Sequence, residues 1–518
     1  MKGFKTKVWV LVVAFALVVP SVFATKMFIP MDAEGQPNHL KAYGIAFMAL
    51  KSGVGVDWML NYKGGSFGME FNKTVAAACD ERGVKYQKLK DGEYKDITKE
   101  VSGLKYDGKV VKLEKAPRIA VYTPLNKEPW DDAVTLALTY AEIPFDKIYA
   151  EEVLNGALDK YDWLHLHHED FTGQYGKFWA QFRTADWYQK DQASAERLAR
   201  KTGFKKVQQM QVAVVKKIRE FVKSGGNMFA MCSATDTYDI ALAADSIDIC
   251  ETQFDNDPMD AEAQSKLKFN KCLAFRNFKL STSPYEYEYS DIDNTNFRKI
   301  DQAHDVFTLN HFSVSVDPVP TMLVQNHTET VKGFMGQTTA FRNEFLKPSV
   351  LVLAENKDLK EARYIHGDLG KGTWTFYGGH DPESYQHAVG APPTNLGFYN
   401  ASPGYRLILN NVLFPAVNRK VVQEIEVSKK NIIAENIPEA KEEIQKIKVT
   451  PIPQSEEFEV ECPPQAAKPV VVITDPSGKE VLRKQLNSNK ERVDVSGLQH
   501  GIYNITVNGE YIYKIVKD

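Results

Sequence analysis

The sequence predicts an α/β protein: a parallel sheet with helices on both faces, preceded by a small α/β segment and followed by a β-sandwich. Between residues 118 and 420, short buried strands alternate with helices, which is the pattern of a parallel sheet. The clearest strands are residues 119–122, 163–166, 227–231 and 373–377, and the clearest helices are residues 132–140, 207–222 and 404–413. From residue 469 onward, apolar and polar residues alternate as they do in half-buried strands.

The composition excludes several classes of protein. Of 518 residues, 43% are hydrophobic and 25% are charged, so the chain is neither disordered nor fibrous. Lys and Arg number 64 against 67 Asp and Glu, which gives a net charge of −3 and no basic excess for nucleic acid. Five cysteines are too few for a disulfide scaffold, although Cys250 and Cys272 are close enough in sequence to pair.

The first 24 residues have the pattern of a secretory signal peptide. Three lysines, at positions 2, 5 and 7, precede an apolar run from Val8 to Phe23, and Ala24 ends the cleavage site. The run is shorter than the ~20 residues of a membrane span, and no second apolar stretch of that length follows. We therefore expect an exported protein, located in the periplasm, at the cell surface or in the medium.

The chain divides into five predicted parts. A helix capped by Asn38 and a strand over residues 56–60 indicate the small α/β segment near the start. The main domain contains an irregular, aromatic-rich stretch, which indicates an insertion. The predicted parts are a signal peptide (1–24), an N-terminal α/β segment (25–112), the main domain (113–420, with an insertion at about 250–345), a charged helix and proline-containing linker (421–468), and the C-terminal β-sandwich (469–518).

Cys232 is the first candidate for chemistry. It follows a predicted strand and precedes a predicted helix, which is the context of a nucleophile elbow. Ala230 and Ala234 are small enough for the tight turn that an elbow requires. The start of the following helix lowers the pKa of a thiol at this position and favours the thiolate. The alternative is a small apolar residue at a strand end, because free cysteines are often simply buried.

The run Gly378 to Glu383 is the second candidate, since it follows the strand over residues 373–377. A histidine just past a strand end lies at the same edge of a parallel sheet as Cys232. His380 is therefore a candidate base, and Glu383 or Asp381 is a candidate group to orient its ring. The alternative is a turn in which His380 and Asp381 satisfy backbone groups.

A run of three imidazoles and two carboxylates follows the strand over residues 163–166. His165 and His167 share one face of the strand and His168 lies on the other, so the run splits the ligands that a metal would need on one side. We therefore expect a polar rim that binds substrate, made by His167, His168, Glu169, Asp170 and Asp381, and neither a metal nor another cofactor.

Two further motifs have plain structural explanations. Residues 64–68 match the Gly-x-Ser-x-Gly pattern of serine hydrolases, but no clear helix follows them. Residues 224–226 match the beginning of an ATP-pyrophosphatase loop, but Asn227 and Met228 replace the acidic residue and serine that come next. The two glycines there are explained by the end of the preceding helix.

Residues 117–420 resemble the class I glutamine amidotransferase-like superfamily, in which a flavodoxin-like sheet carries a Cys-His-Glu triad. The resemblance rests on the elbow at Cys232, the strand and loop at His380, and the closing helix at 404–413. It implies that Cys232 is the nucleophile, His380 the base and Glu383 the group that orients the base. This chain departs from the superfamily in having alanines in place of the elbow glycines and two residues, rather than one, between His and Glu.

Most of the mature chain is similar to an exported bacterial family commonly labelled "asparagine synthetase B". The similarity rests on residues 29–32, 38–44, 57–62, 165–170 and 230–236. Asparagine synthesis requires a cysteine at the mature N-terminus and an ATP-pyrophosphatase loop. Thr25 follows the predicted cleavage site and the loop is absent from the sequence, so the motifs do not support that chemistry.

Residues 469–518 resemble the C-terminal sorting domain of type IX secretion cargo. The matching residues are 475–479, 493–498, 501–503 and 514–517. This resemblance implies that the secretion machinery is a partner. The alternative is an ordinary immunoglobulin-like β-sandwich used for adhesion.

The sequence leaves open whether the protein is an enzyme. One interpretation is a Cys-dependent amidase or hydrolase that acts on a small amide or peptide-like substrate through Cys232, His380 and Glu383. A second is a non-catalytic cell-envelope or surface protein that binds a small-molecule or peptide-like ligand in the same cleft. A third is a metal-dependent hydrolase centred on His167, His168 and Glu169. Substrate, disulfide pairing and oligomeric state are not determined by these patterns.

Overall fold

The computed structural model describes the chain in two compact units, residues 1–423 and 424–518. The described residues are 25–103, 106–124, 132–166, 168–314, 317–386, 388–417, 448–451, 457–462, 469–475, 479–499, 501–507 and 510–517. The predicted signal peptide and the charged stretch at 418–447 lie outside the described residues. Among the helices described, none combines the length and the apolar composition needed to cross a membrane.

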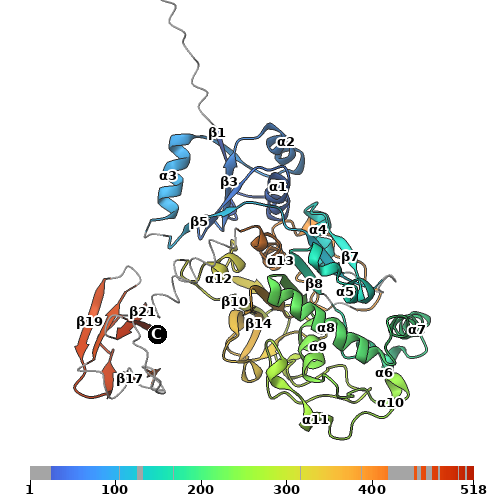
Figure 1. Ribbon diagram of the computed structural model, residues 1–518. Coiled ribbons are helices and arrows are strands. Elements are labelled where there is room, and N and C mark those ends of the chain that lie inside the picture. Colours follow the sequence, from blue (N-terminus) through green and yellow to red (C-terminus); the bar gives the residue numbers. More distant parts are fainter. Residues whose placement is uncertain are drawn as a thin grey trace, which may run out of the picture. The chain divides into compact units, whose positions relative to one another are not determined.

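The chain begins with an antiparallel sheet of order β4-β1-β3-β2-β5. Figure 1 shows α1 and α2 on one side of this sheet and α3 on the other. As predicted, Asn38 caps α1 by accepting a hydrogen bond from the Lys41 amide at 3.2 Å. The elements are β1 (Thr25–Ile29), α1 (His39–Lys51), β2 (Val56–Leu60), β3 (Ser66–Glu70), α2 (Lys73–Arg82), β4 (Gln87–Lys90), α3 (Asp91–Val101) and β5 (Lys109–Leu113).

The main sheet is mixed rather than wholly parallel. Its parallel part has the order β7-β6-β8-β9-β15. Antiparallel strands extend it beyond β15 in the order β14-β13-β10-β11, with β12 paired to β14. The parallel strands are β6 (Ile119–Tyr122), β7 (Asp146–Ile148), β8 (Trp163–Leu166), β9 (Asn227–Met231) and β15 (Gly372–Tyr377); the others are β10 (Val306–Leu309), β11 (Thr330–Lys332), β12 (Phe341–Arg342), β13 (Leu351–Asn356) and β14 (Glu361–Leu369).

Helices cover both faces of the parallel part, and the strands supply side chains to two separate cores. On β6, Ile119 and Val121 join the core beneath α4 and α13, whereas Ala120 and Tyr122 join the core beneath α5, α8 and α9. Alternate side chains point to opposite faces, so a strand buried on both faces is apolar throughout. These helices are α4 (Ala133–Tyr140), α5 (Ala150–Leu154), α8 (Val207–Ser224), α9 (Ser233–Ala243) and α13 (Pro403–Leu413).

The N-terminal sheet and the main sheet share one core through α1, which packs against α13 and α4. Arg406 of α13 is fully buried at this junction. Its guanidinium donates to the carbonyls of Met31 and Gly64 and contacts the rings of His39 and His327, each at 3.1 Å. Burial, and then the charge of Arg406, lower the pKa of His39 to about 3. The N-terminal sheet and its helices are therefore held to the main domain by a buried cation between two neutral rings.

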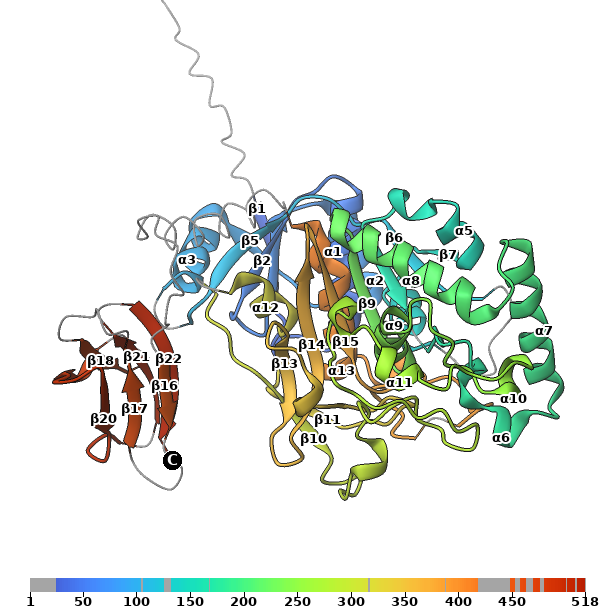
Figure 2. The same ribbon diagram turned by 60° about the horizontal axis from the view of Figure 1, so that its bottom comes forward.

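The predicted insertion is held to the main domain by α9. The Asp239 carboxylate accepts hydrogen bonds from the amides of Leu273, Ala274 and Phe275 at 2.6, 2.7 and 2.9 Å. Figure 2 shows the insertion and α7 around the end of the sheet at which α9 begins. The remaining helices are α6 (Trp179–Phe182), α7 (Asp186–Lys201), α10 (Thr252–Asp255), α11 (Ala263–Lys266) and α12 (Pro318–Leu323), with 3-10 turns at Ala157–Lys160, Tyr175–Lys177, Phe269–Lys271, Thr295–Phe297, Asn343–Phe345, Leu396–Phe398 and Phe414–Ala416.

The second unit consists of two antiparallel sheets around one small core. Their orders are β16-β17-β20 and β19-β18-β21-β22. Residues 448–451 and 457–461, which the sequence analysis assigned to the linker, form two of these strands, and in the second Phe458 and Val460 alternate with outward glutamates. The strands are β16 (Lys448–Pro451), β17 (Glu457–Glu461), β18 (Val470–Thr474), β19 (Glu480–Gln485), β20 (Lys490–Asp494), β21 (Gly501–Val507) and β22 (Glu510–Lys517).

Candidate functional site

Cys232 lies on the turn between β9 and α9, at the carboxyl edge of the main sheet. Its backbone has φ 52° and ψ −138°, a conformation that side-chain-bearing residues rarely adopt. Ala230 and Ala234 on either side of the turn are fully buried. The strained turn expected of an elbow is therefore present at Cys232.

The thiol itself differs from the prediction. Cys232 is 3% exposed, and its Sγ accepts a hydrogen bond from the Gln337 amide at 3.3 Å. Burial raises the pKa of Cys232 to about 11, although the amides of Thr338, Gln337 and Ser233 act in the opposite direction. The expected partly exposed thiol with a lowered pKa is thus wrong, because desolvation outweighs the start of the helix.

Residues 334–339, called here the cover segment, hold the thiol in this state. Gln337 Nε2 donates to the carbonyls of Gly176 and Tyr287 at 2.7 and 2.9 Å. Thr338 Oγ1 donates to the buried carboxylate of Asp236 on α9 at 2.8 Å. The cover segment therefore binds three different parts of the chain around the elbow.

His380 follows β15 after the pair Gly378-Gly379 and is 5% exposed. Its amide donates to the carbonyl of Met335 in the cover segment at 3.0 Å. Its ring lies beside that of His168, with 5.6 Å between the ring centroids. The structure thus brings together His380 and a residue of the predicted polar rim, whereas backbone amides, among them that of Gln337, donate to the Cys232 sulfur.

The packing of the cover segment explains why two glycines, Gly378 and Gly379, precede His380. A Cβ on Gly378 would lie 2.3 Å from the carbonyl oxygen of Thr339. Gly379 has φ 97°, which residues with a side chain avoid. Both glycines are therefore needed for the cover segment to pack on the end of β15.

The two carboxylates after His380 hold the loop to α13. Asp381 accepts hydrogen bonds from the hydroxyls of Tyr405 at 2.9 Å and Thr394 at 2.6 Å, and from the Glu383 amide at 2.9 Å. Burial raises the pKa of Glu383, while a hydrogen bond with Ser402 at the start of α13 lowers it. These contacts give Asp381 and Glu383 a structural role in loop packing.

A cavity of about 200 Å³ lies at the carboxyl ends of β6, β7 and β8. We call it the β6–β8 cavity. Pro124 follows β6, Tyr149 follows β7, and three of the predicted rim residues follow β8. Residues at the carboxyl ends of three adjacent strands therefore line the cavity. It is lined by Pro124, Tyr149, His168, Glu169, Asp170, Gly173, Tyr175, Gly176, Phe178, Trp187, Tyr188, Asp191, Ser194, Ala195, Leu198, Val207 and Gln211.

Three of the predicted rim residues line this cavity, and their roles differ. Glu169 is 9% exposed, and His168 lies beside His380. Asp170 shapes the loop, because its carboxylate accepts hydrogen bonds from the amides of Thr172 at 2.6 Å and Gly176 at 3.0 Å. His167 lies outside the described residues.

The aromatic wall of the cavity was missed by the sequence analysis. It comes mostly from residues 175–188, which were not assigned to any site. The signal was present in the sequence as an aromatic-rich stretch, Tyr-Gly-Lys-Phe-Trp followed by Phe182 and Trp187-Tyr188. Such clusters indicate packing as often as binding, so only the fold shows that these rings surround a cavity.

His165 and the one cluster of possible metal ligands among the described residues both have partners within the protein. The His165 ring lies 3.2 Å from the Phe229 carbonyl and 3.3 Å from Asp132, which caps α4. Ligand atoms of Asp248, Cys250 and Asp255 lie within 4.8 Å of one another. However, the Lys206 ammonium forms ion pairs with both Asp248 and Asp255, so it supplies the positive charge that balances these two carboxylates.

All five cysteines are buried and free, so Cys250 and Cys272, which are close enough in sequence to pair, are not joined in this structure. The Cys250 thiol donates to the carbonyl of Thr172 at 3.2 Å, and the Cys272 thiol donates to that of Asp239 at 3.3 Å. Each sulfur is held by a different part of the fold. The described residues therefore contain no disulfide bond.

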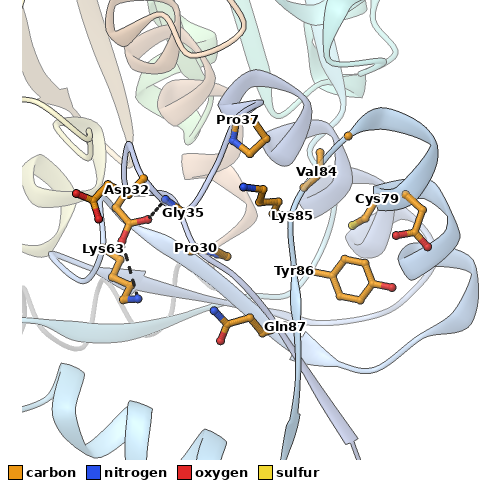
Figure 3. Close-up of a pocket in the computed structure, with 13 residues that line it drawn as sticks. Pro30, Asp32, Gly35, Pro37, Lys63, Cys79, Val84, Lys85, Tyr86 and Gln87 are labelled. Atoms are coloured by element: carbon orange, nitrogen blue, oxygen red, sulfur yellow. Dashed lines mark hydrogen bonds and ion pairs between the residues drawn. The ribbon is translucent and has the colours of Figure 1, made fainter.

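A larger groove of about 690 Å³ lies in the N-terminal segment (Figure 3). Its lining contains both acidic and basic residues. Asp32 accepts a hydrogen bond from the Gly35 amide at 2.8 Å and pairs with Lys63 at 3.9 Å. Burial raises the pKa of its cysteine, Cys79, to about 12. The groove thus presents neither an activated nucleophile nor one dominant charge.

The serine of the 64–68 motif is also structural. Ser66 Oγ donates to the carbonyl of Tyr62 at 3.1 Å and accepts from the Met31 amide at 3.3 Å. A strand, β3, begins at this serine, where an elbow requires a helix.

The comparison with known families identifies the second unit. Residues 448–518 match the family described as the secretion system C-terminal sorting domain. The protein is therefore exported, and it is secreted or attached to the cell surface. A sorting tail of this kind is a segment for the secretion machinery. Among curated proteins, none matches the sequence.

Solved structures give only weak similarities. Two cytoplasmic proteins from Salmonella typhimurium match at 10% and 12% identity, cover 57% and 58% of this chain and 97% and 100% of their own, and have TM-scores of 0.28 and 0.29. A β-galactosidase from Bacillus circulans matches at 9% identity over 74% of this chain and 40% of its own, with a TM-score of 0.22. These TM-scores define no shared fold or activity.

Proposed function

We propose that this protein is a non-catalytic ligand-binding protein of the cell surface or the medium, and that the β6–β8 cavity is its binding site. The observation that carries the proposal is the position of the cavity. In open α/β sheets, ligands bind in the crevice at the carboxyl ends of the strands where the strand order reverses. The β6–β8 cavity lies at those ends and at that reversal.

The strand order supports a finer description of the fold. Numbered along the chain, β6, β7, β8, β9 and β15 take the spatial order 2-1-3-4-5, which is the order of flavodoxin-like sheets. The first and third strands, β6 and β8, then flank the reversal point. We therefore propose a flavodoxin-like main domain, related to the class I glutamine amidotransferase-like proteins and extended by antiparallel strands.

The burial of the Cys232 thiol is the reason that we favour a binding function over a catalytic one. A cysteine nucleophile acts as a thiolate, and the pKa of Cys232 is about 11 because the thiol is buried. Its would-be partners Asp381 and Glu383 hydrogen-bond to other groups. The label of the exported "asparagine synthetase B" family is a proposal of relationship only, since the synthetase motifs are missing.

A cavity-blocking variant tests the binding function. Ala195 of α7 lines the cavity, and Ala195→Phe would fill part of it. Gln189→Phe, at an exposed position of the same helix, is the matched control. Thermal stabilisation by a panel of small molecules is expected to be lost in Ala195→Phe and kept in Gln189→Phe. Equal stabilisation in both variants would place the binding elsewhere.

A Cys-dependent amidase remains the second candidate, and the strained backbone of Cys232 is what favours it. Such strain occurs at nucleophile elbows and is otherwise costly by roughly 1–3 kcal/mol. This function requires the cover segment to move away from the sulfur. Hydrolysis of small amides that is abolished by Cys232→Ala but kept by Cys79→Ala would establish it. Hydrolysis that survives Cys232→Ala, or none at all, would exclude it.

A further inference from the structure

The cover segment has no regular secondary structure and connects two short strands, β11 and β12. Its first half is fixed through backbone groups, because Arg363 donates to the Phe334 carbonyl and Met335 exchanges hydrogen bonds with the loop at 380–385. Its second half, residues 337–339, contacts the elbow, α9 and the insertion instead. Gly336 separates the two halves, so the second half has a joint about which it can move while the first half stays in place.

Two buried carboxyl groups hold the second half. The Thr338 hydroxyl donates to Asp236 Oδ1 on α9 at 2.8 Å, and the Thr339 amide donates to Asp293 Oδ1 on the insertion at 3.0 Å. Neither threonine nor either aspartate is more than 2% exposed. The second half of the cover segment thus closes over two acids at the same time as it closes over Cys232.

Each of these carboxyl groups has one oxygen that accepts hydrogen bonds and one that does not. Asp293 Oδ1 also accepts from the hydroxyl and the amide of Thr295 at 2.8 and 3.1 Å, and Asp236 Oδ1 accepts from the Thr237 amide at 3.0 Å. Both Oδ2 atoms are buried without a hydrogen-bond partner in the described part of the chain. A buried charged oxygen without donors costs more than a neutral hydroxyl, so this arrangement favours the protonated acids.

The electrostatic surroundings favour the same protonated form. Burial raises the pKa of Asp293 to about 7 and raises that of Asp236 well above its usual range. The charge of Asp293 acts on Asp236 in the same direction, and the charge of Glu288 does so on Asp293. The other titratable and charged groups around the pair are Cys232 at the elbow, Tyr287 and Tyr289 on the insertion, His380 after β15, and the ion-paired set Arg298, Asp305, Glu361 and Arg363.

We propose that the cover segment is a lid that protons hold shut: its second half closes over Cys232 while Asp236 and Asp293 are neutral, and it loosens when Asp293 ionises. An ionised Asp293 gains solvation only if Thr339 moves away from it, so loss of the proton and opening of the lid are coupled. This device does not involve the β6–β8 cavity and goes beyond the proposed binding function.

The coupling fixes the direction of the pH dependence. The closed lid keeps the proton of Asp293 up to about pH 7, whereas a solvated aspartate loses it near about pH 4. Between these values, each pH unit raises the ratio of open to closed lid by up to about tenfold. Opening also breaks the hydrogen bonds of Gln337 and the bond from the Gly379 amide to the Thr338 carbonyl, which do not depend on pH. Cys232 is therefore protected best in weakly acidic solution.

Reaction of Cys232 with a pyridyl disulfide, a reagent that labels thiols in weakly acidic solution, measures the opening. The rate in the folded chain is divided by the rate in urea at the same pH, which removes the titration of the thiol itself. This ratio should rise at least about tenfold between pH 5 and pH 7. In Asp293→Asn, which is neutral at every pH and keeps the acceptor oxygen, the rise should be at least about fivefold smaller. Asp358→Asn, at an exposed position between β13 and β14, is the matched control and should behave as the unaltered protein.

Hydrogen exchange of the unaltered protein distinguishes a lid from general unfolding and requires no variant to fold. After correction for the intrinsic pH dependence of exchange, the protection of the amides at 337–339 should fall at least about tenfold from pH 5 to pH 7. It should also stay at least about tenfold below the protection of β9 at both pH values. Protection equal to that of β9 would show that Cys232 is reached only when the whole domain unfolds, which overturns the lid. A labelling ratio that is constant with pH, or that rises equally in Asp293→Asn, overturns it as well.

Discussion

Cys232 and the β6–β8 cavity lie at the same edge of the main sheet, yet they differ in every property that governs access. The Cys232 sulfur is buried and accepts a hydrogen bond from a backbone amide. Side-chain hydrogen bonds fix the cover segment that lies over it. The cavity keeps about 200 Å³ of open volume next to carboxylates and rings. Position in the fold therefore makes both regions candidates, and the hydrogen bonds around them distinguish the two.

The difference arises from what the insertion contributes to each region. Its residues 334–339 pack on the end of β15 and on α9, where Asp236 and the glycines before His380 accommodate them. The ends of β6, β7 and β8 receive α7 and the 175–178 turn instead, and these leave a space between them. One insertion thus covers the elbow, while a different segment forms the binding wall.

The largest expected effect is on the reactivity of Cys232. With a pKa of about 11 and 3% exposure, the thiol should alkylate at least about 100-fold more slowly in the folded protein at pH 7.5 than in urea. Mass spectrometry after timed iodoacetamide treatment measures the rate at each cysteine. Labelling of Cys232 at the rate of a free thiol would show that the elbow is as accessible as the β6–β8 cavity, which contradicts the difference drawn between the two regions.

Loosening the cover segment sharpens the same contrast. Gln337→Ala removes the two hydrogen bonds of the side-chain amide to Gly176 and Tyr287. We expect the free energy of unfolding to fall by about 2 kcal/mol and alkylation of Cys232 to accelerate about tenfold. Gln302→Ala, at an exposed site of the insertion, is the control. An unchanged alkylation rate in Gln337→Ala would show that this side chain does not protect the sulfur.

The parallel core could be predicted from the sequence because its signals are local. The strands at 119–122, 163–166 and 227–231 are short apolar runs between helices, and the structure places strands at these residues. The antiparallel extension could not be predicted in this way. Strand β10 pairs with β13, with Thr308 opposite Glu355, so no local periodicity indicates its place in the sheet.

The chemistry of the site was harder to predict than the position of its residues. The elbow at Cys232 is where the pattern placed it, but its burial depends on Gln337, which is 105 residues away. Likewise, Glu169 was predicted to lie at a polar rim, whereas Trp187 and Asp191 reach the cavity from a helix that has no motif. Solvent access is a property of tertiary packing, and a single sequence carries no direct signal for it.

A titration of stability probes the buried carboxylates beneath the cover segment. Asp293 accepts from the Thr339 amide at 3.0 Å, and burial raises its pKa to about 7. The folded state therefore holds a proton between about pH 4 and pH 7 that the unfolded state has released, so stability falls as the pH rises through this window. We expect Asp293→Asn to reduce this fall by about 1 to 2 kcal/mol between pH 5 and pH 6.5. Urea unfolding at these pH values measures it, and parallel curves for the two proteins would contradict it.

The smallest expected effect concerns the second unit. Its two sheets surround a core of their own, so removal of residues 448–518 should leave the melting temperature of the rest within about 1 °C. Because these residues match a sorting domain, the shortened protein should no longer reach the medium or the surface. Calorimetry and cell fractionation measure the two effects. A large loss of melting temperature would show that the units depend on each other.

The central claim is that the molecule acts through the β6–β8 cavity and not through the cysteine elbow. Thermal stabilisation by a panel of small molecules, measured on the unaltered protein, Cys232→Ser and Ala195→Phe, compares the two regions in one experiment. The account predicts that Cys232→Ser is stabilised as the unaltered protein is, while Ala195→Phe loses the stabilisation. Lost stabilisation in Cys232→Ser with normal stabilisation in Ala195→Phe would contradict it.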